Sequence, residues 1–473
     1  MTQLPNHETE LLVLGGGPGG YAAAFYAADL GKKVIVVELE EALGGVCLHR
    51  GCIPSKALLH ATHLLEETQQ AHEFGFNFQK PEIDLNTLRA WKKQTIDTLA
   101  RGISSLAKSR NVEVLKGRGY FEDKHTLRVE TTKGQIFINF QQAIIAVGSR
   151  ANLPSAFDLG NPRIMTSRAA LELEDVPETL LVIGGGYIGM ELGSVYSRLG
   201  SKTTLVEAEN RLLTGIDKDL ITPVIKSARS SFSEIHLSTN VLKMATQGKQ
   251  IRPTIRFADG VTSEPLFDRV LVSVGRHPRT QNIGLENTAI QTDQRGFIQV
   301  NETLQTDEPS ISAIGDCIGG AMLAHKAHHE AKTAIDALYQ PDEPQNTPQV
   351  PAVVFTDPEI AWCGTTEAQA KEESIPFKTA KFPWSTSGRA ISVGRGNGFT
   401  KILIDPETER ILGMGIVGNG AGELISEGTL AIEMGATAYD LAKTIHPHPT
   451  LSETIMEAAE LFYGHATHFR STK

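Results

Sequence analysis

Residues 11–20 read LLVLGGGPGG, a short apolar run followed at once by a glycine-rich turn. The turn has the glycine spacing of a dinucleotide-binding loop, at Gly15, Gly17 and Gly20. An alanine-rich helical pattern follows to Leu30, and a second apolar run at 34–37 ends at Glu38. In such a strand–helix–strand unit the glycines let a pyrophosphate approach the N-terminus of the helix, where the helix dipole and free N–H groups stabilise it. We expect the Glu38 carboxylate to accept hydrogen bonds from a ribose.

The same pattern returns at residues 180–189, LLVIGGGYIG. Its glycines are Gly184, Gly186 and Gly189. A helical pattern runs to Leu199, and the next apolar run, 203–206, ends at Glu207. In both copies 23 residues separate the first glycine from the glutamate, and the copies are 169 residues apart. One such loop is weak evidence, because ordinary strand-to-helix turns are also rich in glycine. Two copies with matching acids predict two dinucleotide sites in an α/β protein with two Rossmann-like domains.

Length and charge limit the remaining possibilities. The chain has 473 residues, a formal charge of −10, 40% hydrophobic and 21% charged residues, which indicates about two to four globular domains. An acidic balance argues against nucleic acid as a partner, because phosphate backbones need a basic face. No apolar run approaches the roughly 18 residues that cross a bilayer, and the start MTQLPNHETE lacks the character of a secretory signal. We therefore expect a cytoplasmic protein without membrane insertion.

A close cysteine pair is the main chemical signal. The chain has only four cysteines, too few for a disulfide-stapled scaffold, and Cys47 and Cys52 lie together in GGVCLHRGCIPSK at 44–56. Pro54 suits the first turn of a helix, and a thiol at a helix N-terminus has a lowered pKa. Two such sulfurs can close a disulfide and accept two electrons. A static structural disulfide is the alternative, whereas a zinc site needs further ligands.

These motifs, in this order, resemble the flavin disulfide oxidoreductases over essentially the whole chain. Downstream, the proline-rich segment 340–351 reads as a linker, and a mixed strand and helix pattern after it predicts an α+β domain. The resemblance implies the cofactors FAD and NAD, a redox-active disulfide and a homodimer. It divides the chain into an FAD-binding domain (1–150), an NAD-binding domain (151–276), a central segment completing the FAD domain (277–347) and a dimerisation domain (348–473).

The resemblance also assigns flavin contacts. AIGDC at 313–317 is similar to the family's second flavin motif, in which Asp316 binds the ribityl chain. The helix after MLAH at 322–325 is implied to point its N-terminus at the flavin. Lys56 is implied to lie near the flavin and to pair with Glu191. Further cofactor contacts are implied at Gly119, Ala324, Val241 and Gly275. Three histidines on the same helix invite a metal interpretation, but no carboxylate set accompanies them beyond Glu330, so we expect no metal. They are His325, His328 and His329.

The segment HPHPTLSE at 446–453 is similar to the family's acid–base motif. The resemblance makes His448 the acid–base group, acting on the active site of the other subunit, with Glu453 orienting its imidazole. Thr450 and Glu453 also have the spacing of a helix capping box, and both roles coexist if each carboxylate oxygen serves one of them. We expect His446 to be structural, or at most a contact in the substrate channel.

Two features select a branch of the family. Glu207 suits the 2′-hydroxyl of NAD and repels the 2′-phosphate of NADP, and the loop after it offers Arg211 alone. The C-terminal tail carries no cysteine pair. The resemblance is therefore closest to members that oxidise protein-bound dihydrolipoamide, with lipoyl domains of a 2-oxoacid dehydrogenase complex or the glycine cleavage system as partners. An NAD(P)H-dependent reductase of another low-molecular-weight disulfide, or a non-catalytic flavoprotein, remain alternatives.

The chain departs from the family pattern at three places. His49 stands where an asparagine is common, Tyr26 where an arginine is common, and HPHPT replaces HAHPT. His49 and Arg50 lie beside the cysteines, where they can shift the thiol pKa and the redox balance. None of these departures removes a reacting group. We expect Cys317 and Cys363 to be small buried side chains.

Overall fold

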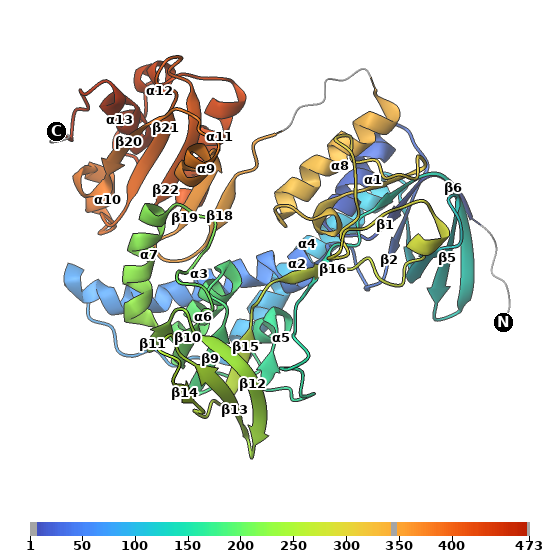
Figure 1. The fold of residues 1–473 in the computed structure, drawn as a ribbon, viewed down its shortest axis with the longest axis horizontal. Coiled ribbons are helices and arrows are strands. Elements are labelled where there is room, and N and C mark those ends of the chain that lie inside the picture. The colour runs from blue at the N-terminus through green and yellow to red at the C-terminus, as the bar shows by residue number, and fades with distance from the viewer. Residues whose placement is uncertain (1–6, 342–347, 471–473) are drawn as a thin grey trace.

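The computed structural model describes residues 7–341 and 348–470, and these form three units (Figure 1). The first is a seven-stranded sheet in the order β3-β2-β1-β6-β5-β4, with β17 beside β6. Its strands are β1 (His7–Leu14), β2 (Val34–Glu38), β3 (Glu113–Lys116), β4 (Arg118–Phe121), β5 (Thr126–Thr131), β6 (Gly134–Ile145) and β17 (Ile311–Ala313). The helices α1 (Pro18–Asp29) and α8 (Ala324–Tyr339) pack on one another beside it.

The first glycine loop follows β1, a central strand of this sheet. Strand β1 has parallel neighbours on both edges, β2 and β6, and apolar clusters cover both of its faces. Leu11 and Val13 pack toward α1, whereas Leu12 and Leu14 pack on the other face with Phe121. The loop after Leu14 is therefore held by a rigid strand end.

The second unit repeats the first around the second glycine loop. Its parallel sheet has the order β11-β10-β9-β15-β8. Leu11 pairs with Val34 in the first unit and Leu180 pairs with Thr203 in the second, so even the strand register repeats. The strands are β8 (Ile164–Met165), β9 (Thr179–Ile183), β10 (Lys202–Val206), β11 (Glu234–His236) and β15 (Arg269–Val272), with a separate small sheet of β12 (Asn240–Gln247), β13 (Gln250–Arg256) and β14 (Thr262–Ser263). The helices are α5 (Ser167–Glu172), α6 (Tyr187–Leu199) and α7 (Lys218–Ser231).

The C-terminal unit is an antiparallel sheet with helices, as the sequence predicts for an α+β domain. Its strands are β18 (Ala352–Val354), β19 (Ile360–Gly364), β20 (Lys378–Pro383), β21 (Phe399–Ile404) and β22 (Ile411–Val417). Its helices are α9 (Glu367–Glu372), α10 (Gly388–Ser392), α11 (Ala421–Glu433), α12 (Ala438–Lys443) and α13 (Glu453–Phe462). Trp384 and Phe382 fill its core. The predicted linker at 340–351 lies partly outside the described residues.

Helices and short crossing strands join the units. They are α2 (Gly45–Arg50), α3 (Cys52–Gln70), α4 (Leu85–Ser109), β7 (Ser149–Ala151) and β16 (Arg276–Pro278), with short 3₁₀ turns at Ala71–Phe74, Leu285–Asn287, Gly315–Ile318 and Trp384–Thr386. Helix α3 packs on α6 of the second unit. The strands β7 and β16 pair antiparallel where the chain passes between the two units. None of the described helices is both long and apolar enough to cross a membrane.

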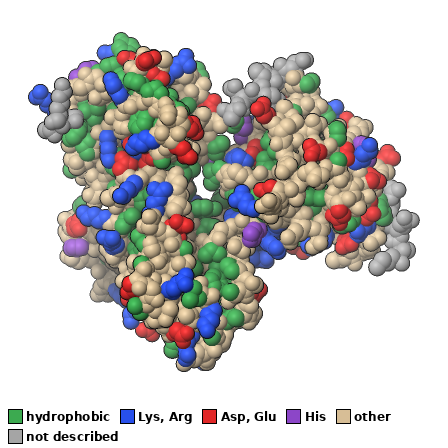
Figure 2. Space-filling view, in the orientation of Figure 1, with side chains coloured by type: hydrophobic (Ala, Val, Ile, Leu, Met, Phe, Trp, Pro, Cys, Tyr) green, Lys and Arg blue, Asp and Glu red, His purple; other side chains and the backbone are tan. Residues whose placement is uncertain are grey.

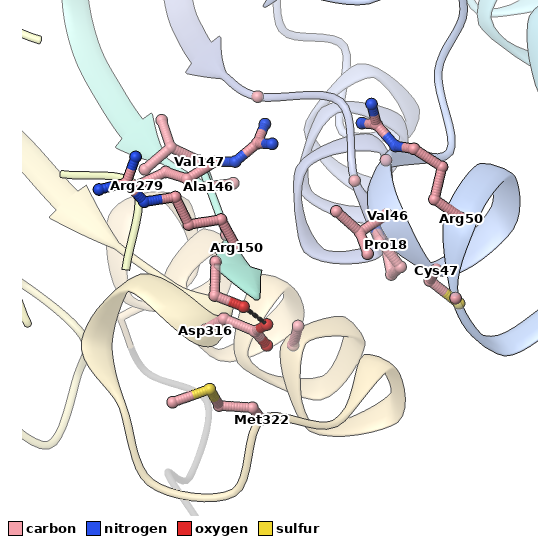
Figure 3. Close-up of a pocket in the computed structure, with 18 of the residues that line it drawn as sticks. Pro18, Val46, Cys47, Arg50, Ala146, Val147, Arg150, Arg279, Asp316 and Met322 are labelled. Carbon is pink, nitrogen blue, oxygen red and sulfur yellow. Dashed lines mark hydrogen bonds between the residues drawn. The ribbon is translucent and has the colours of Figure 1, made fainter. Parts of the chain in front are cut away.

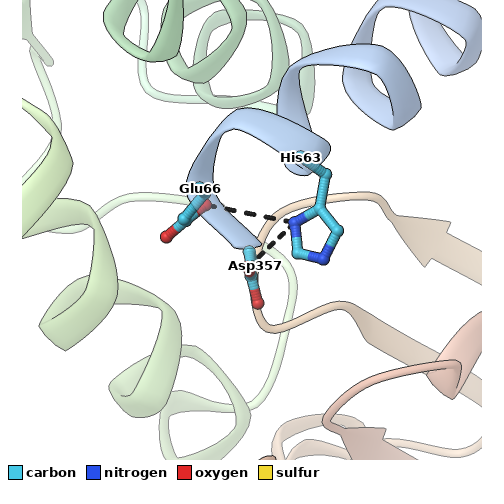
Figure 4. Close-up of side chains that lie close together, drawn as sticks. All are labelled: His63, Glu66 and Asp357. Atoms are coloured by element: carbon cyan, nitrogen blue, oxygen red, sulfur yellow. Dashed lines mark ion pairs between the residues drawn. The ribbon is translucent and has the colours of Figure 1, made fainter. Parts of the chain in front are cut away.

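Charged clusters connect the C-terminal unit to α3 and to the second unit. His63 of α3 lies 3.4 Å from Asp357, which follows β18 (Figure 4). Arg198 of α6 contacts Asp357 as well, at 3.5 Å. Elsewhere Lys401, with 1% of its side chain exposed, makes ion pairs with Asp217 and Glu367 and so joins β21 and α9 to the start of α7. The cluster around Asp357 thus fixes α3 and α6 against the C-terminal unit.

Candidate functional site

A cavity of about 580 Å³ lies where the first and second units meet. Its wall combines the first glycine loop, the segment from Gly45 to Lys56, the start of α6 and the start of α8. Figure 3 shows Cys47 and Pro18 on one side of this cavity and Asp316 and Met322 on another. Segments far apart in the sequence therefore share one site.

The first glycine loop leaves the N-terminus of α1 open to the cavity. A Cβ atom on Gly20 would lie 1.8 Å from the carbonyl oxygen of Gly15, so only glycine fits there. At Gly17 a Cβ atom would meet nothing closer than 3.9 Å, and Pro18 at the first helical position has no N–H to satisfy. This cradle fits a pyrophosphate, as the sequence predicts.

Glu38 holds this loop in place. Its Oε2 accepts a hydrogen bond from the N–H of Gly16 at 2.6 Å, and its Oε1 accepts one from Glu40 at 2.8 Å. Each oxygen keeps a second acceptor position, so contact with a ribose remains available. The requirement for glycine at position 16 was not predicted from the sequence. A Cβ atom there would lie 2.5 Å from the Leu43 side chain. The unbroken GGG in both copies is the signal that would have identified it.

The second loop repeats this geometry. A Cβ atom on Gly189 would lie 2.0 Å from the carbonyl oxygen of Gly184. Glu207 accepts hydrogen bonds from Gly185 at 2.6 Å and from Glu209 at 2.8 Å, as Glu38 does in the first copy. Gly186 has no atom within 4 Å of an added Cβ, so the N-terminus of α6 is open.

The second loop does not line the cavity. Helix α6 separates the two, and its first turns reach the cavity through Tyr187 and Glu191. Gly275 and Val241 also lie outside the cavity wall, whereas Gly119 and Ala324 are part of it. The sequence-predicted cofactor residues thus fall into two groups, one on the cavity and one around the second loop.

The two cysteines lie at the junction of α2 and α3. Both are free thiols in this structure, and Cys52 is the first residue of α3. A hydrogen bond from Cys47 lowers the pKa of Cys52 to about 7; burial opposes this shift, and the positive charge of Lys56 adds to it. The same hydrogen bond, together with burial, raises the pKa of Cys47. Near neutral pH the negative charge of the pair therefore resides on Cys52.

Lys56 and Glu191 form the expected ion pair, with Nζ 2.8 Å from Oε2. Glu191, whose side chain is 4% exposed, also accepts hydrogen bonds from Ser55 Oγ at 3.1 Å and from the N–H of Phe355 at 3.1 Å. Lys56 Nζ lies 4.4 Å from the centre of the Phe355 ring. Through the ring and the N–H of Phe355, the C-terminal unit thus contacts the ion pair that holds α3, the helix that starts at Cys52.

Asp316 lies on the cavity wall beside two residues that the sequence argument missed. Ser149 Oγ donates a hydrogen bond to Asp316 Oδ2, and Arg276 Nε lies 3.8 Å from the same oxygen. Arg276 Nε also donates to Ser149 Oγ at 2.7 Å. Ser149 and Arg276 each follow the glycine that ends the similar runs AIIAVG and VLVSVG, and this shared position is the signal that would have found them.

His448 and Glu453 form a pair on the C-terminal unit. His448 Nδ1 lies 2.9 Å from Glu453 Oε1, and Glu453 Oε2 accepts a hydrogen bond from the N–H of Thr450 at 2.7 Å. Burial acts to raise the pKa of Glu453, but the Thr450 N–H and His448 lower it below its ordinary value. The capping-box prediction is confirmed for the Glu453 carboxylate, which accepts from the N–H of Thr450. It is wrong for the Thr450 hydroxyl, which bonds the Pro447 carbonyl and the Ser452 hydroxyl and caps no helix, because α13 starts only at Glu453. The His448 side chain is 72% exposed and is not part of the cavity wall of its own chain.

Comparison with known proteins matches this architecture throughout. Residues 9–331 match the family described as pyridine nucleotide-disulphide oxidoreductase, and residues 350–459 match its dimerisation domain. The chain belongs to this family. It is 41% identical to a dihydrolipoyl dehydrogenase of Vibrio parahaemolyticus over 98% of both chains. It is 43% identical to one of Geobacillus stearothermophilus over 98% of this chain and 97% of the other.

Solved structures of flavoprotein disulfide reductases have the same fold. LpdA of Mycobacterium tuberculosis superposes with a TM-score of 0.88 at 29% identity, covering 96% of this chain and 99% of the other. The HOCl-induced flavoprotein disulfide reductase RclA of Escherichia coli, solved as a Cu(II) complex, has a TM-score of 0.86 at 25% identity, covering 98% of this chain and all of the other. The dimerisation domain makes this oxidoreductase a homodimer.

The departures from the family pattern have local partners in this oxidoreductase. His49 Nε2 lies 2.9 Å from the carbonyl oxygen of Leu43, and Arg50 pairs with Glu40 at 2.6 Å. Tyr26 donates a hydrogen bond to Asp336 of α8 at 2.6 Å. Cys317 and Cys363 are buried, as predicted, and burial raises the pKa of each thiol.

Two acidic clusters in the described residues have the spacing of metal ligands, and both already hold cations. In the first, His63, Glu66 and Asp357 lie together (Figure 4). Arg198 is 2.7 Å from Glu66. In the second, Asp217, Asp219 and Glu367 surround the ammonium group of Lys401. Both clusters connect the C-terminal unit to neighbouring elements.

Proposed function

We propose that this chain oxidises dihydrolipoamide to lipoamide and reduces NAD, the reaction of a dihydrolipoyl dehydrogenase. The observation that carries the proposal is the pair of thiols on the cavity wall, in which Cys52 has a pKa of about 7 and hydrogen-bonds Cys47. Relatives of that name match at 41–43% identity over 98% of the chain. The dithiol loses two electrons and two protons, and NAD gains a hydride while one proton is released.

The residues of the cavity fit FAD. The open N-terminus of α1 fits its pyrophosphate, and Glu38 fits its adenosine ribose. Asp316 and the N-terminus of α8 are the flavin-side contacts. When bound, FAD supplies the two-electron chemistry that connects a dithiol to a pyridine nucleotide.

The second loop fits NAD. The open N-terminus of α6 fits the NAD pyrophosphate, and Glu207 presents a carboxylate to the ribose, where a 2′-phosphate would be repelled. Helix α6 connects this site to the cavity, because its Glu191 holds Lys56 beside Cys52. The two cofactor sites are thus linked by one rigid helix.

The cysteines exchange with the substrate. Cys47, the thiol on the substrate side, is attacked by a substrate thiolate when it is in a disulfide with Cys52, so that Cys52 leaves as the thiolate. A pKa of about 7 makes Cys52 a good leaving group at neutral pH. Lys56 stabilises the negative charge that then appears on Cys52.

His448 takes the substrate proton in the partner subunit. Its imidazole is exposed and is held by Glu453, whose carboxylate stays ionised at neutral pH because its pKa is lowered. Because His448 is outside the cavity wall of its own chain, each active site needs the C-terminal unit of the other copy. The dimer is therefore part of the catalytic unit.

Partners, location and domain limits belong to the same proposal. The substrate is carried by lipoyl domains of a 2-oxoacid dehydrogenase complex or the glycine cleavage system, in the cytoplasm. The domain limits are those predicted from the sequence, and β17 supports them by returning the segment 277–347 to the first sheet.

Purified protein tests the proposal directly. Dihydrolipoamide should reduce NAD at least 100-fold faster than NADP, and glutathione and other monothiols should give little reduction. If NADPH reduced another small disulfide faster than NADH reduced lipoamide, the chain would instead be a reductase of that disulfide. A dithiol that leaves the flavin spectrum unchanged would point to a non-catalytic flavoprotein.

A further inference from the structure

The cavity wall is positively charged although the chain is acidic. Seven cationic side chains and four carboxylates line the cavity, in a chain of formal charge −10. The cations are Arg50, Lys56, Arg118, Arg150, Arg168, Arg276 and Arg279, and the carboxylates are Glu38, Glu40, Glu191 and Asp316. Acidic and basic side chains are interspersed over the face seen in Figure 2, so the surplus is a property of the cavity and not of that surface. A cavity of this charge is suited to a ligand with more than one negative charge.

Three of these cations have carboxylate partners and four do not. Arg50 pairs with Glu40 at 2.6 Å, Lys56 with Glu191 at 2.8 Å, and Arg276 lies 3.8 Å from Asp316. Within the part of the chain that the structure describes, no ion pair is formed by Arg118, Arg150, Arg168 or Arg279. Their charges are available to a ligand.

Two of the unpaired arginines cluster with Arg50. Burial lowers the pKa of Arg279, and the positive charges of Arg50 and Arg168 lower it further, against the opposing effect of Glu40. Burial acts to raise the pKa of Glu40, but Arg50, Arg168 and Arg279 together hold it below its ordinary value. Three like charges are therefore held close to one carboxylate, which leaves a local excess of positive charge.

The cluster is assembled from three separate elements. Arg50 ends α2, Arg168 lies in the first turn of α5, and Arg279 directly follows β16. Figure 3 shows Arg50 and Arg279 on facing sides of the cavity. Like charges held on two sides of an open space attract an anion into the space between them.

The first glycine loop is a second anion-binding feature of the same cavity. The N-terminus of α1 opens into the same cavity, but a helix end supplies only about half a unit of positive charge. A pyrophosphate carries two negative charges, and the Glu38 carboxylate bound to Gly16 adds a further negative charge at the loop. We propose that Arg50, Arg168 and Arg279 form an arginine clamp that binds the pyrophosphate of FAD together with the first glycine loop. The planar guanidinium fork suits paired phosphate oxygens. This inference rests on the proposed FAD site and adds to it residues from three other elements.

Release of FAD from the purified holoenzyme tests the clamp without using activity. The readout is the rise of flavin fluorescence after dilution, at low and high potassium chloride. Arg279→Gln and Arg168→Gln should each speed release by about ten-fold at low salt, because a charge-assisted hydrogen bond is lost. The two variants should also flatten the dependence of release on salt. Arg229→Gln on α7 removes the same charge from an exposed site and should release FAD like the wild type.

Conservative variants keep the test decisive if a glutamine variant folds poorly. Arg279→Lys and Arg168→Lys retain the charge and should restore most of the FAD retention. Unchanged release and unchanged salt dependence in both glutamine variants would overturn the clamp while leaving the oxidoreductase assignment intact. Competition by inorganic phosphate that depends on the arginines, with FAD release unaffected, would assign the cluster to a free anion and would also overturn it.

Discussion

The Nζ of Lys56 lies 2.8 Å from Oε2 of Glu191, and this ion pair joins the helix that starts at Cys52 to the helix that follows the second glycine loop. Removing the lysine removes a cause of the low Cys52 pKa. Lys56→Met should therefore raise the pKa of Cys52 from about 7 by roughly one unit, so that less thiolate is present at neutral pH. Alkylation of the reduced protein by iodoacetamide across pH measures this. Lys226→Met, an exposed change on α7, should leave the profile unmoved, and an unmoved profile in Lys56→Met would refute the role of the lysine.

The His448–Glu453 pair should control proton transfer. His448→Gln should slow turnover by roughly 10²–10⁴, the usual scale of general acid–base catalysis. Glu453→Gln keeps a hydrogen-bonding side chain but removes the charge that steadies the imidazolium, so it should slow turnover by a smaller factor, about ten-fold or more. Steady-state rates across pH measure both. Rates within two-fold of wild type in His448→Gln would remove His448 from the mechanism.

His446 provides a matched comparison. Its Nε2 lies 2.7 Å from Glu427 Oε1, a pair as close as that of His448, yet we assign it a structural role. The hydrogen bond to Glu427 raises the pKa of His446 from 6.5. The stability it adds is thus complete below about pH 6.5 and is lost as pH rises through the raised value. His446→Gln should lower the melting temperature by roughly 1–3 °C at about pH 6 and by less at about pH 9. The opposite order would contradict the assignment.

A substitution in the second glycine loop should weaken NAD binding and leave FAD binding intact. Gly189→Ala places a Cβ 2.0 Å from the carbonyl oxygen of Gly184 and must displace the start of α6. We expect the KM for NAD to rise by roughly ten-fold or more while FAD stays bound. Gly102→Ala in α4 meets no atom within 4 Å and serves as the control. Loss of FAD with unchanged NAD affinity in Gly189→Ala would show that the two loops have been assigned the wrong way round.

The local elements of the fold were accessible from the sequence, and the contacts between distant segments were not. The glycine spacing, the apolar runs and the glutamate that ends each second run are local, and both copies fold as predicted, with Leu11–Val34 and Leu180–Thr203 in the same register. The Lys56–Glu191 pair was expected only through resemblance to a family, because 135 residues separate the two side chains. Arg168 and Arg279 carry no local motif, so only the folded chain brings them to Arg50. The start of α13 was misplaced because Thr450 and Glu453 have capping-box spacing, whereas Thr450 Oγ1 instead bonds Pro447 and Ser452.

The central claim is that electrons pass from a dithiol through Cys52 toward NAD. The most direct measurement is dihydrolipoamide-dependent NADH formation by the Cys52→Ser homodimer, with bound flavin quantified by its absorbance. Cys52→Ser removes the thiol with the pKa of about 7 and leaves the glycine loops intact. We expect full flavin occupancy and no dithiol-dependent NADH. Flavin at full occupancy together with NADH formation near the wild-type rate would contradict it.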